Sequence, residues 1–169
     1  MKIGYNVGSG QRPFKSNGEV IWRNVDSQEK WNPDIRCRGE ELPCSDDSVD
    51  YVVLHHVLEH FGCGEGAGLI KEAHRVLRPR GLLQVFVPNL CTLAHRWRAR
   101  GISTQIYMTN IYGAYMGNED DRHKWGFDAQ SLSDFLHCCD WALISDKCRD
   151  IPGADVARDW WILETECVK

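Results

Sequence analysis

Two glycines and one acid near the start of the chain have the residue types and the spacing of a ligand site. Residues 2–7 have the pattern of a short strand, and the chain continues directly into Gly8, Ser9 and Gly10. Asp26 follows at the end of a second short apolar run. Glycines let the backbone approach a ligand closely, and an acid that ends the next strand can accept hydrogen bonds from both hydroxyls of a ribose. The spacing therefore predicts a nucleoside site in an open α/β sheet.

The turn lacks the third glycine of a dinucleotide-binding fingerprint. That glycine would open a long helix whose N-terminus holds a pyrophosphate, but Pro13 stands at its position. The polar residues 15–18 leave little room for a full helix before the next strand. We therefore expect a truncated first helix and a nucleoside ligand without phosphates, a description that S-adenosylmethionine (SAM) fits.

Histidines follow the predicted central strand of this sheet. His55 and His56 come directly after residues 50–54, a nearly continuous apolar run that is typical of a strand buried on both faces of a parallel sheet. The carboxyl ends of such strands are where α/β sheets bind ligands. His60 lies one helical turn further on, and we expect it to orient the loop by a hydrogen bond rather than to take part in catalysis.

A long connection over residues 101–127 holds a second group of candidate residues. Connections of this length are often functional lids. If the ligand is SAM and its methyl group is transferred, a general base is needed only where the acceptor atom is protonated and weakly nucleophilic. His123 is the first candidate for this base, and His56 is the second. Lys124 could hold an anionic acceptor or be a surface lysine. Trp125 and Phe127 are expected in the core or in a pocket wall.

Length and composition indicate an ordinary globular protein. The 169 residues fit one domain over residues 1–169 that is large enough to bury a core. The net charge of −4 gives no global preference for nucleic acid or for an anionic membrane. Because no apolar stretch reaches membrane-spanning length and the N-terminus has no signal-peptide pattern, we expect a cytoplasmic protein.

The 8 cysteines lack the spacing of a zinc site. No Cys-x-x-Cys pair occurs in the sequence, and reduced thiols fit the expected cytoplasmic location. The run His137-Cys138-Cys139 resembles a ligand cluster, but adjacent residues on a helix point in different directions. We therefore expect core packing there, and no metal site.

Apolar periodicity and turn residues give the remaining elements. We expect strands at 2–7, 20–25, 35–38, 50–54, 82–87, 143–151 and 160–168. Helices are expected at 69–77, at 92–100 and from Asp128, a plausible N-cap, onward. The glycine-rich residues 62–66 are expected to interrupt the chain before the first of these helices.

Six short motifs, in this order and at this spacing, resemble those of the class I SAM-dependent methyltransferases, and more narrowly the small "methyltransferase type 11" group. They are Gly8-Ser9-Gly10, Asn24-Val25-Asp26, Glu41-Leu42-Pro43, Ser48-Val49-Asp50-Tyr51-Val52, His56-Val57-Leu58-Glu59-His60 and His74-Arg75-Val76-Leu77-Arg78-Pro79-Arg80-Gly81. The resemblance is dense over residues 2–90. It implies a Rossmann-like SAM methyltransferase fold of class α/β, with a mostly parallel seven-strand sheet and a C-terminal antiparallel hairpin.

The resemblance also implies roles for individual residues. Gly8 and Gly10 match the glycine turn beneath the methionine part of the cofactor, and Asp26 matches the ribose-binding acid. The loop that flanks adenine in the family corresponds to Glu40, Glu41 and Leu42. The strand end that meets the amino-acid end of the cofactor corresponds to Leu54 and His55.

Two positions depart from the family pattern. Asn6 stands near where many members have an acid, and Arg38 stands where many have the adenine-binding aspartate. These departures keep open a non-catalytic SAM-fold binding protein as an alternative, while Pro13 argues against a nicotinamide-dependent oxidoreductase. The favoured prediction is a SAM-dependent methyltransferase that acts on a small-molecule or sugar-like acceptor, without a nucleic acid or membrane partner.

Overall fold

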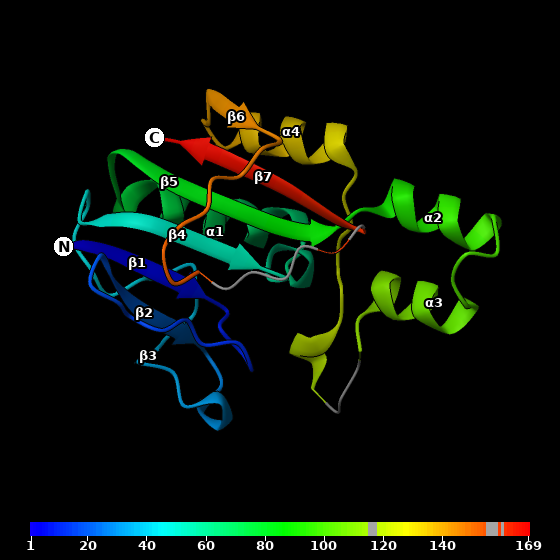
Figure 1. Ribbon diagram of the computed structural model, residues 1–169, viewed down its shortest axis with the longest axis horizontal. Coiled ribbons are helices and arrows are strands. Elements are labelled where there is room, and N and C mark those ends of the chain that lie inside the picture. The colour runs from blue at the N-terminus through cyan, green and yellow to red at the C-terminus, as the bar shows by residue number, and fades with distance from the viewer. Residues whose placement is uncertain (115–117, 155–158, 160) are drawn as a thin grey trace.

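The computed structural model describes residues 1–114, 118–154, 159 and 161–169. Within these residues the chain forms one seven-stranded sheet with the order β3-β2-β1-β4-β5-β7-β6 (Figure 1). The strands are β1 (Lys2–Val7), β2 (Val20–Asp26), β3 (Ile35–Arg36), β4 (Val49–His55), β5 (Leu77–Pro88), β6 (Leu143–Ser145) and β7 (Ile162–Val168). The α-helices are α1 (Cys63–Val76), α2 (Leu90–Arg98), α3 (Thr104–Tyr112) and α4 (Ala129–Cys138). Short 3₁₀ turns occur at Glu29–Trp31, Leu58–His60 and Glu119–Asp121.

The sheet is parallel from β3 to β5 and antiparallel at its other end. β7 pairs antiparallel with both β5 and β6, so the last strand is inserted beside the fifth. This arrangement confirms the predicted Rossmann-like fold with a C-terminal antiparallel hairpin. The prediction succeeded because an apolar run such as Val52, Val53 and Leu54, all fully buried, is typical of a central strand in a parallel sheet.

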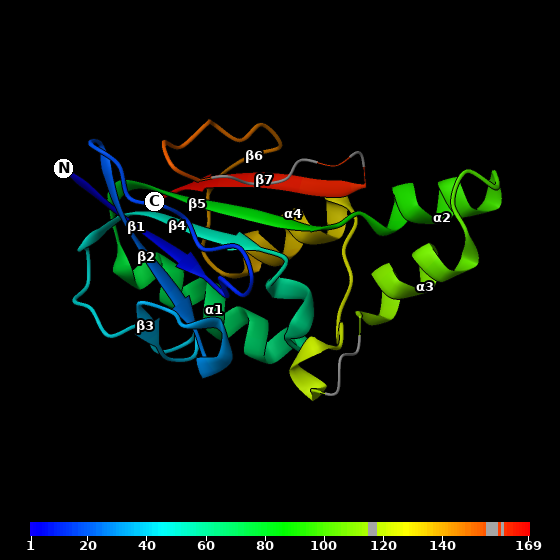
Figure 2. The same cartoon turned by 60° about the horizontal axis from the view of Figure 1, so that its bottom comes forward.

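The two faces of the sheet are covered differently. Helices α1 and α4 lie on one face (Figure 2), where Val52 and Leu54 of β4 join the larger core. On the opposite face Val53 packs in a second cluster with Phe14 and Ile151, which come from loops. The alternation of side chains along β4 therefore supplies both cores.

No helix occurs between β1 and β2, all of whose residues are described, so the expected truncated helix is absent altogether. Buried amides hold the loop instead. The side-chain Nδ2 of Asn6 donates to the carbonyl of Arg12 at 2.9 Å. Asn24 accepts from the N–H of Phe14 at 2.7 Å and donates to its carbonyl at 3.0 Å. Phe14 then packs edge-on against Trp22. Asn6, a departure from the family pattern, thus fixes the loop that replaces the helix.

Helix α1 begins at Cys63, so the expected interruption at residues 62–66 is wrong. Gly62 is the N-cap, and its N–H donates to the Glu65 carboxylate at 3.3 Å. Gly66 is buried, and a Cβ there would lie only 3.3 Å from Leu58 and 3.4 Å from Phe135. Gly66 therefore serves close packing inside the helix, a role that a glycine-rich sequence does not reveal.

The segment predicted as a long connection contains helix α3, which lies beside α2 beyond the carboxyl end of the parallel strands (Figures 1 and 2). Stacked rings of Trp97 and Tyr107, with centroids 4.9 Å apart, join the two helices. Tyr115 and Gly117 of this segment lie outside the described residues, as does Trp160 at the start of the last predicted strand.

Among the described residues, no helix combines the length and the apolarity that a membrane crossing would need.

Candidate functional site

A cavity of about 480 Å³ opens at the carboxyl ends of the parallel strands. Its size lies within the range of about 300–1,000 Å³ that is usual for ligand pockets. The loops after β1, β2, β3 and β4 contribute to it, together with the segment between α3 and α4. The lining includes Gly8, Gly10, Asp26, Arg38, Glu40, His56, His60, Asp121, His123 and Lys124.

The glycine turn after β1 has a backbone that other residues would strain. Gly8 has a φ of +66° and Gly10 a φ of +47°, a region that only glycine occupies readily. A Cβ at position 8 would lie 2.5 Å from the side chain of Val57. Ser9 is buried, and its N–H donates to the carbonyl of Val25 at 3.0 Å. Ser9 thus supports the turn, while the two glycines face the cavity.

The carboxylate of Asp26 is held in position by two backbone groups. The N–H of Gly10 donates to its Oδ2 at 2.9 Å and the N–H of Gln28 donates to its Oδ1 at 2.8 Å. The residue is only 7% exposed and lines the cavity. Because each carboxylate oxygen can accept a second hydrogen bond, Asp26 remains able to bind two neighbouring hydroxyls.

The loop after β3 contributes Glu40, while the next two predicted residues lie elsewhere. Glu40 accepts from Arg38 through Oε1 at 3.1 Å, and its Oε2 is buried without a hydrogen-bond partner among the described residues. Glu41 is exposed and does not line the cavity. Leu42 is buried, and its N–H donates to Glu72 at 2.7 Å.

At the end of β4 the structure separates three residues that the sequence placed together. Leu54 is fully buried in the core, and His55 packs against Phe86 with ring centroids 5.6 Å apart. Neither lines the cavity. His56 does, and it has a φ of +58°. A left-handed conformation in a residue other than glycine is a strain that clusters at functional sites.

His56 is paired with a buried acid. Its Nδ1 lies 2.8 Å from Oε1 of Glu59, which is only 1% exposed. Burial acts to raise the pKa of the Glu59 carboxyl, but the hydrogen bond from His56 and the proximity of the His56, His60 and His123 imidazoles outweigh it. The pKa of Glu59 therefore lies below its usual value.

His60 and His123 meet edge to face, with ring centroids 4.8 Å apart. Nδ1 of His123 lies 2.9 Å from the carbonyl oxygen of Asn110, and Nδ1 of His60 lies 3.1 Å from that of Arg122. Burial lowers the pKa of the His123 imidazole below its usual value. The predicted loop-orienting hydrogen bond of His60 is therefore present, and it joins the turn after β4 to the segment that carries His123.

The residues after His123 have different surroundings. The N–H of Lys124 donates to the carbonyl of Glu59 at 2.8 Å, and its Nζ lies 3.8 Å from the Glu65 carboxylate. Phe127 is buried in the core, as expected. Trp125 is 48% exposed and does not line the cavity, so the expectation of a core or wall position is wrong for it.

Sequence reasoning missed several residues that line the cavity. They come from helix α3 and from loops and turns without a motif, and they include Arg12, Gln28, Trp31, Asn110, Asp120, Asp121, Asp159 and Trp161. Asp120 and Asp121 follow Asn118, which caps the 3₁₀ turn. Three consecutive acids after an asparagine were the one signal available, and residue spacing does not say which way such side chains point.

The fold is the Rossmann-like fold of SAM methyltransferases, and comparisons with known proteins agree. A family model described as "Methyltransferase domain" matches residues 13–85. A probable S-adenosylmethionine-dependent methyltransferase of Mycobacterium tuberculosis is 46% identical over 54 residues, which are 32% of this chain and 19% of that protein. A relative from Mycolicibacterium smegmatis is 44% identical over 54 residues, 32% of this chain and 20% of that protein. The chain thus spans about a fifth of the length of these relatives.

Solved structures share the whole fold at low identity. A Burkholderia thailandensis 1,6-didemethyltoxoflavin-N1-methyltransferase, solved with S-adenosylhomocysteine bound, matches 99% of this chain and 70% of its own with a TM-score of 0.60 and 16% identity. A SAM-dependent methyltransferase from Archaeoglobus fulgidus matches 99% of this chain and 86% of its own with a TM-score of 0.61 and 13% identity. The resemblance to class I SAM-dependent methyltransferases, stated from the sequence, is confirmed.

Proposed function

We propose that this protein binds SAM in the cavity and transfers its methyl group to a small-molecule or sugar-like acceptor. The observation that carries the proposal is the continuity of the cavity. Gly8, Gly10 and Asp26 line the same cavity as His56 and His123. The sequence and fold similarities to SAM-dependent methyltransferases support the same activity.

Each part of SAM would have a partner among the residues of the cofactor end. The ribose hydroxyls would donate to the free lone pairs of Asp26, and the methionine part would lie over the strained turn at Gly8 and Gly10. Glu40 has a buried Oε2 without a partner in the described part of the chain. That oxygen could accept from the exocyclic amine of adenine, which would relieve the cost of an unpaired buried acceptor. Glu40 would then replace the aspartate that the family has at the position of Arg38.

Methyl transfer from SAM requires few catalytic groups from the protein. The acceptor atom forms a bond to the methyl carbon while the bond from that carbon to sulfur breaks, and its electron pair stays on sulfur. SAM becomes S-adenosylhomocysteine, whose sulfur is neutral. The protein must align three atoms and exclude water, and such positioning can supply about 7–11 kcal/mol of the barrier. A cavity at the edge of the sheet suits that task.

The acceptor end is rich in groups that bind hydroxyls and amines. Asp120 and Asp121 line it, and Oδ2 of Asp121 is buried without a partner among the described residues. His56 and His123 each have Nδ1 engaged by another group, which leaves Nε2 available toward a ligand. Carboxylates and imidazoles of this kind favour a small polyhydroxylated or amine-bearing acceptor. The catalytic roles predicted for His56 and His123 stay predictions.

The alternatives are weaker on specific grounds. A SAM-fold protein that has lost its activity would be expected to lose its pocket, yet the cavity is large and its glycine turn is intact. A nicotinamide-dependent oxidoreductase would need a helix N-terminus for the pyrophosphate, and no helix follows β1 before β2 in the described chain.

The discriminating experiment incubates the protein with SAM labelled in its methyl group and a panel of sugars, polyols and amines. Transfer of label to any of them supports the proposal, and binding of SAM without transfer to any acceptor class would favour the non-catalytic alternative.

A further inference from the structure

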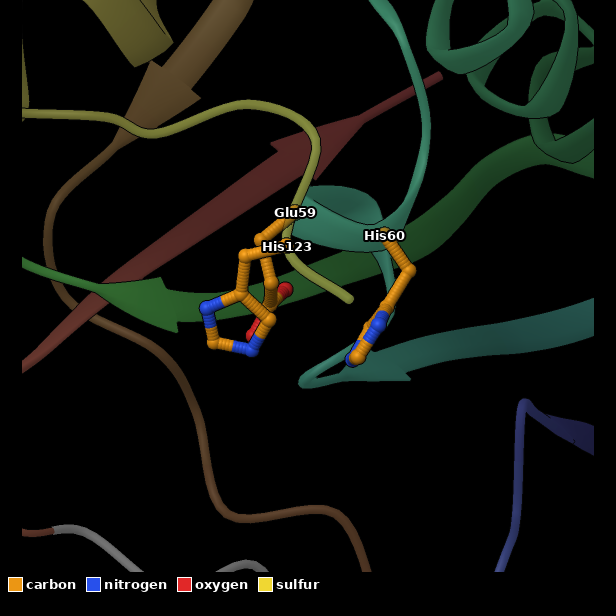
Figure 3. Close-up of side chains that lie close together, drawn as sticks. All are labelled: Glu59, His60 and His123. Atoms are coloured by element: carbon orange, nitrogen blue, oxygen red, sulfur yellow. The ribbon is translucent and has the colours of Figure 1, made fainter. Parts of the chain in front are cut away.

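Three side chains at the acceptor end of the cavity bring together atoms that can bind a metal ion. One donor atom from each of Glu59, His60 and His123 lies within 4.8 Å of the other two. Figure 3 shows the carboxylate of Glu59 beside the ring of His123, with the ring of His60 facing them. Two of the three, His60 and His123, line the cavity. A ligand held between them would therefore be reached from the proposed acceptor site.

The two imidazoles have the tautomer and the support of metal ligands. Nδ1 of His60 and Nδ1 of His123 each lie within hydrogen-bond distance of a backbone carbonyl oxygen, from Arg122 and Asn110 respectively. A carbonyl oxygen can only accept, so each Nδ1 carries the proton and each Nε2 keeps a lone pair. Histidines that bind metals usually donate their other ring N–H in this way, which fixes the orientation of the ring.

Glu59 supplies an oxygen that nothing else satisfies. Its Oε1 accepts from His56, but its Oε2 is fully buried and has no hydrogen-bond partner in the described part of the chain. A buried carboxylate oxygen without a partner is costly. A cation bound at Oε2 would remove that cost, and burial of the side chain excludes competing water.

We propose that Glu59, His60 and His123 form a site for one divalent transition-metal ion. Bonds of about 2.1 Å to nitrogen and oxygen place ligand atoms about 3.4 Å apart on the edges of a tetrahedron. The present separations, up to 4.8 Å, are wider. Small rotations of the half-buried rings of His60 and His123 would bring the three atoms into contact with an ion.

The donor set selects the kind of metal. Two imidazoles and one carboxylate suit ions such as Zn²⁺, Co²⁺, Mn²⁺ and Fe²⁺, whereas Mg²⁺ prefers oxygen ligands throughout. Three protein ligands leave positions open for water or substrate. If the proposed methyl transfer is correct, on which this last step rests, an acceptor hydroxyl would occupy an open position. His123 would then be a ligand rather than the free base predicted from the sequence.

The test uses metal alone, so it does not depend on methyl transfer. The purified protein is stripped with a chelator. It is then titrated with Co²⁺, followed by visible absorption, and with Zn²⁺ and Mg²⁺ by calorimetry. We expect one Co²⁺ or Zn²⁺ per chain, bound at least about a hundredfold more tightly than Mg²⁺. Failure of both ions to bind, or equal affinity for Mg²⁺, would overturn the proposal.

Variants test which residues bind the ion. This test is needed because the chain also has eight free cysteines, whose thiols could bind it instead. His60→Ala, His123→Ala and Glu59→Gln should each weaken Co²⁺ binding by about tenfold or more. Glu59→Gln nearly preserves the shape of the side chain and keeps an acceptor for His56. A loss of Co²⁺ binding in this variant would therefore not be explained by misfolding. The matched control is His95→Ala, since His95 is exposed on α2. Unchanged Co²⁺ affinity in the three variants would place the ion at cysteine thiols and reject the site. SAM titration of the same samples separates a failure of this site from a failure of the proposed function.

Discussion

The carboxylate of Asp26 accepts a hydrogen bond from the N–H of Gly10 at 2.9 Å, across 16 residues of sequence. The end of β2 therefore sets the position of the turn after β1, and the acid that would bind a ribose also fixes the glycines beside it. This coupling means that the cofactor site does not need a helix after β1 to hold its shape.

Replacing Asp26 should weaken cofactor binding more than it weakens the fold. Asp26→Ala removes the acceptor for two ribose hydroxyls as well as the anchor of Gly10. Hydrogen bonds to a charged group contribute about 1.5–3 kcal/mol, so SAM affinity should fall about tenfold to a hundredfold. Calorimetric titration measures the affinity, and thermal unfolding of the same samples reports the stability. Equal SAM affinity in the variant and the wild type would show that another residue holds the ribose.

The glycine turn offers a matched pair of substitutions. Gly8→Ala puts a Cβ 2.5 Å from Val57 in a left-handed conformation, whereas nothing lies within 4 Å of a Cβ at Gly18. We expect Gly8→Ala to lower the free energy of unfolding by about 1–3 kcal/mol and to reduce SAM affinity, while Gly18→Ala changes neither. Chemical denaturation and SAM titration check both. Full SAM affinity in Gly8→Ala would contradict the close approach of the cofactor to this turn.

Glu72 should make stability depend on pH in the acid range. Its hydrogen bonds from Arg75, and a weaker contribution from the N–H of Leu42, outweigh its burial and lower the pKa of its carboxyl below the usual 4.5. A lowered pKa in the folded state contributes stability above the unfolded value, and that stability is lost as the pH falls through the lower folded value. Glu72→Gln should therefore cost about 1.5–3 kcal/mol at pH 7 and less at pH 3. Denaturation at both pH values checks this, with exposed Glu19→Gln as the control. A cost for Glu72→Gln that is the same at both pH values would contradict the account.

Helix α3 should become more protected when ligand binds. None of its residues is buried, and Ile106, Met108 and Tyr112 are exposed, so local opening costs little. Thr109 and Asn110 line the cavity, and a ligand that contacts them would hold the helix closed. Hydrogen exchange over residues 104–112, with and without S-adenosylhomocysteine, measures the change. Strong protection that is equal in both states would show a rigid element instead of a cover.

The sequence predicted the sheet well because apolar runs and turn residues report burial directly. Gly8, Gly10, Asp26 and His56 follow strand ends and line the cavity, because strand order places those ends at one edge. Their roles in binding and catalysis stay predictions. The sequence-based prediction failed at the loop after β1, where the buried amides of Asn6 and Asn24 replace a helix through contacts that residue spacing does not encode.

The meeting of Glu59 and His60 with His123 could not be predicted either. His123 lies far from Glu59 and His60 along the chain. The three side chains meet only when the turn after β4 packs against the segment before α4. That packing depends on backbone bonds such as those from the N–H groups of Lys124 and Trp125 to the carbonyl of Glu59. Such bonds carry no signature in side-chain pattern.

Calorimetric titration of the wild-type protein with SAM, with S-adenosylhomocysteine and with NAD tests the central claim most directly. The turn at Gly8 and Gly10, the carboxylate of Asp26 and the absence of a helix N-terminus after β1 in the described chain all favour a nucleoside without a pyrophosphate. We predict that SAM and S-adenosylhomocysteine each bind with one molecule per chain and that NAD does not bind. Binding of NAD without binding of SAM or its demethylated product would contradict the account.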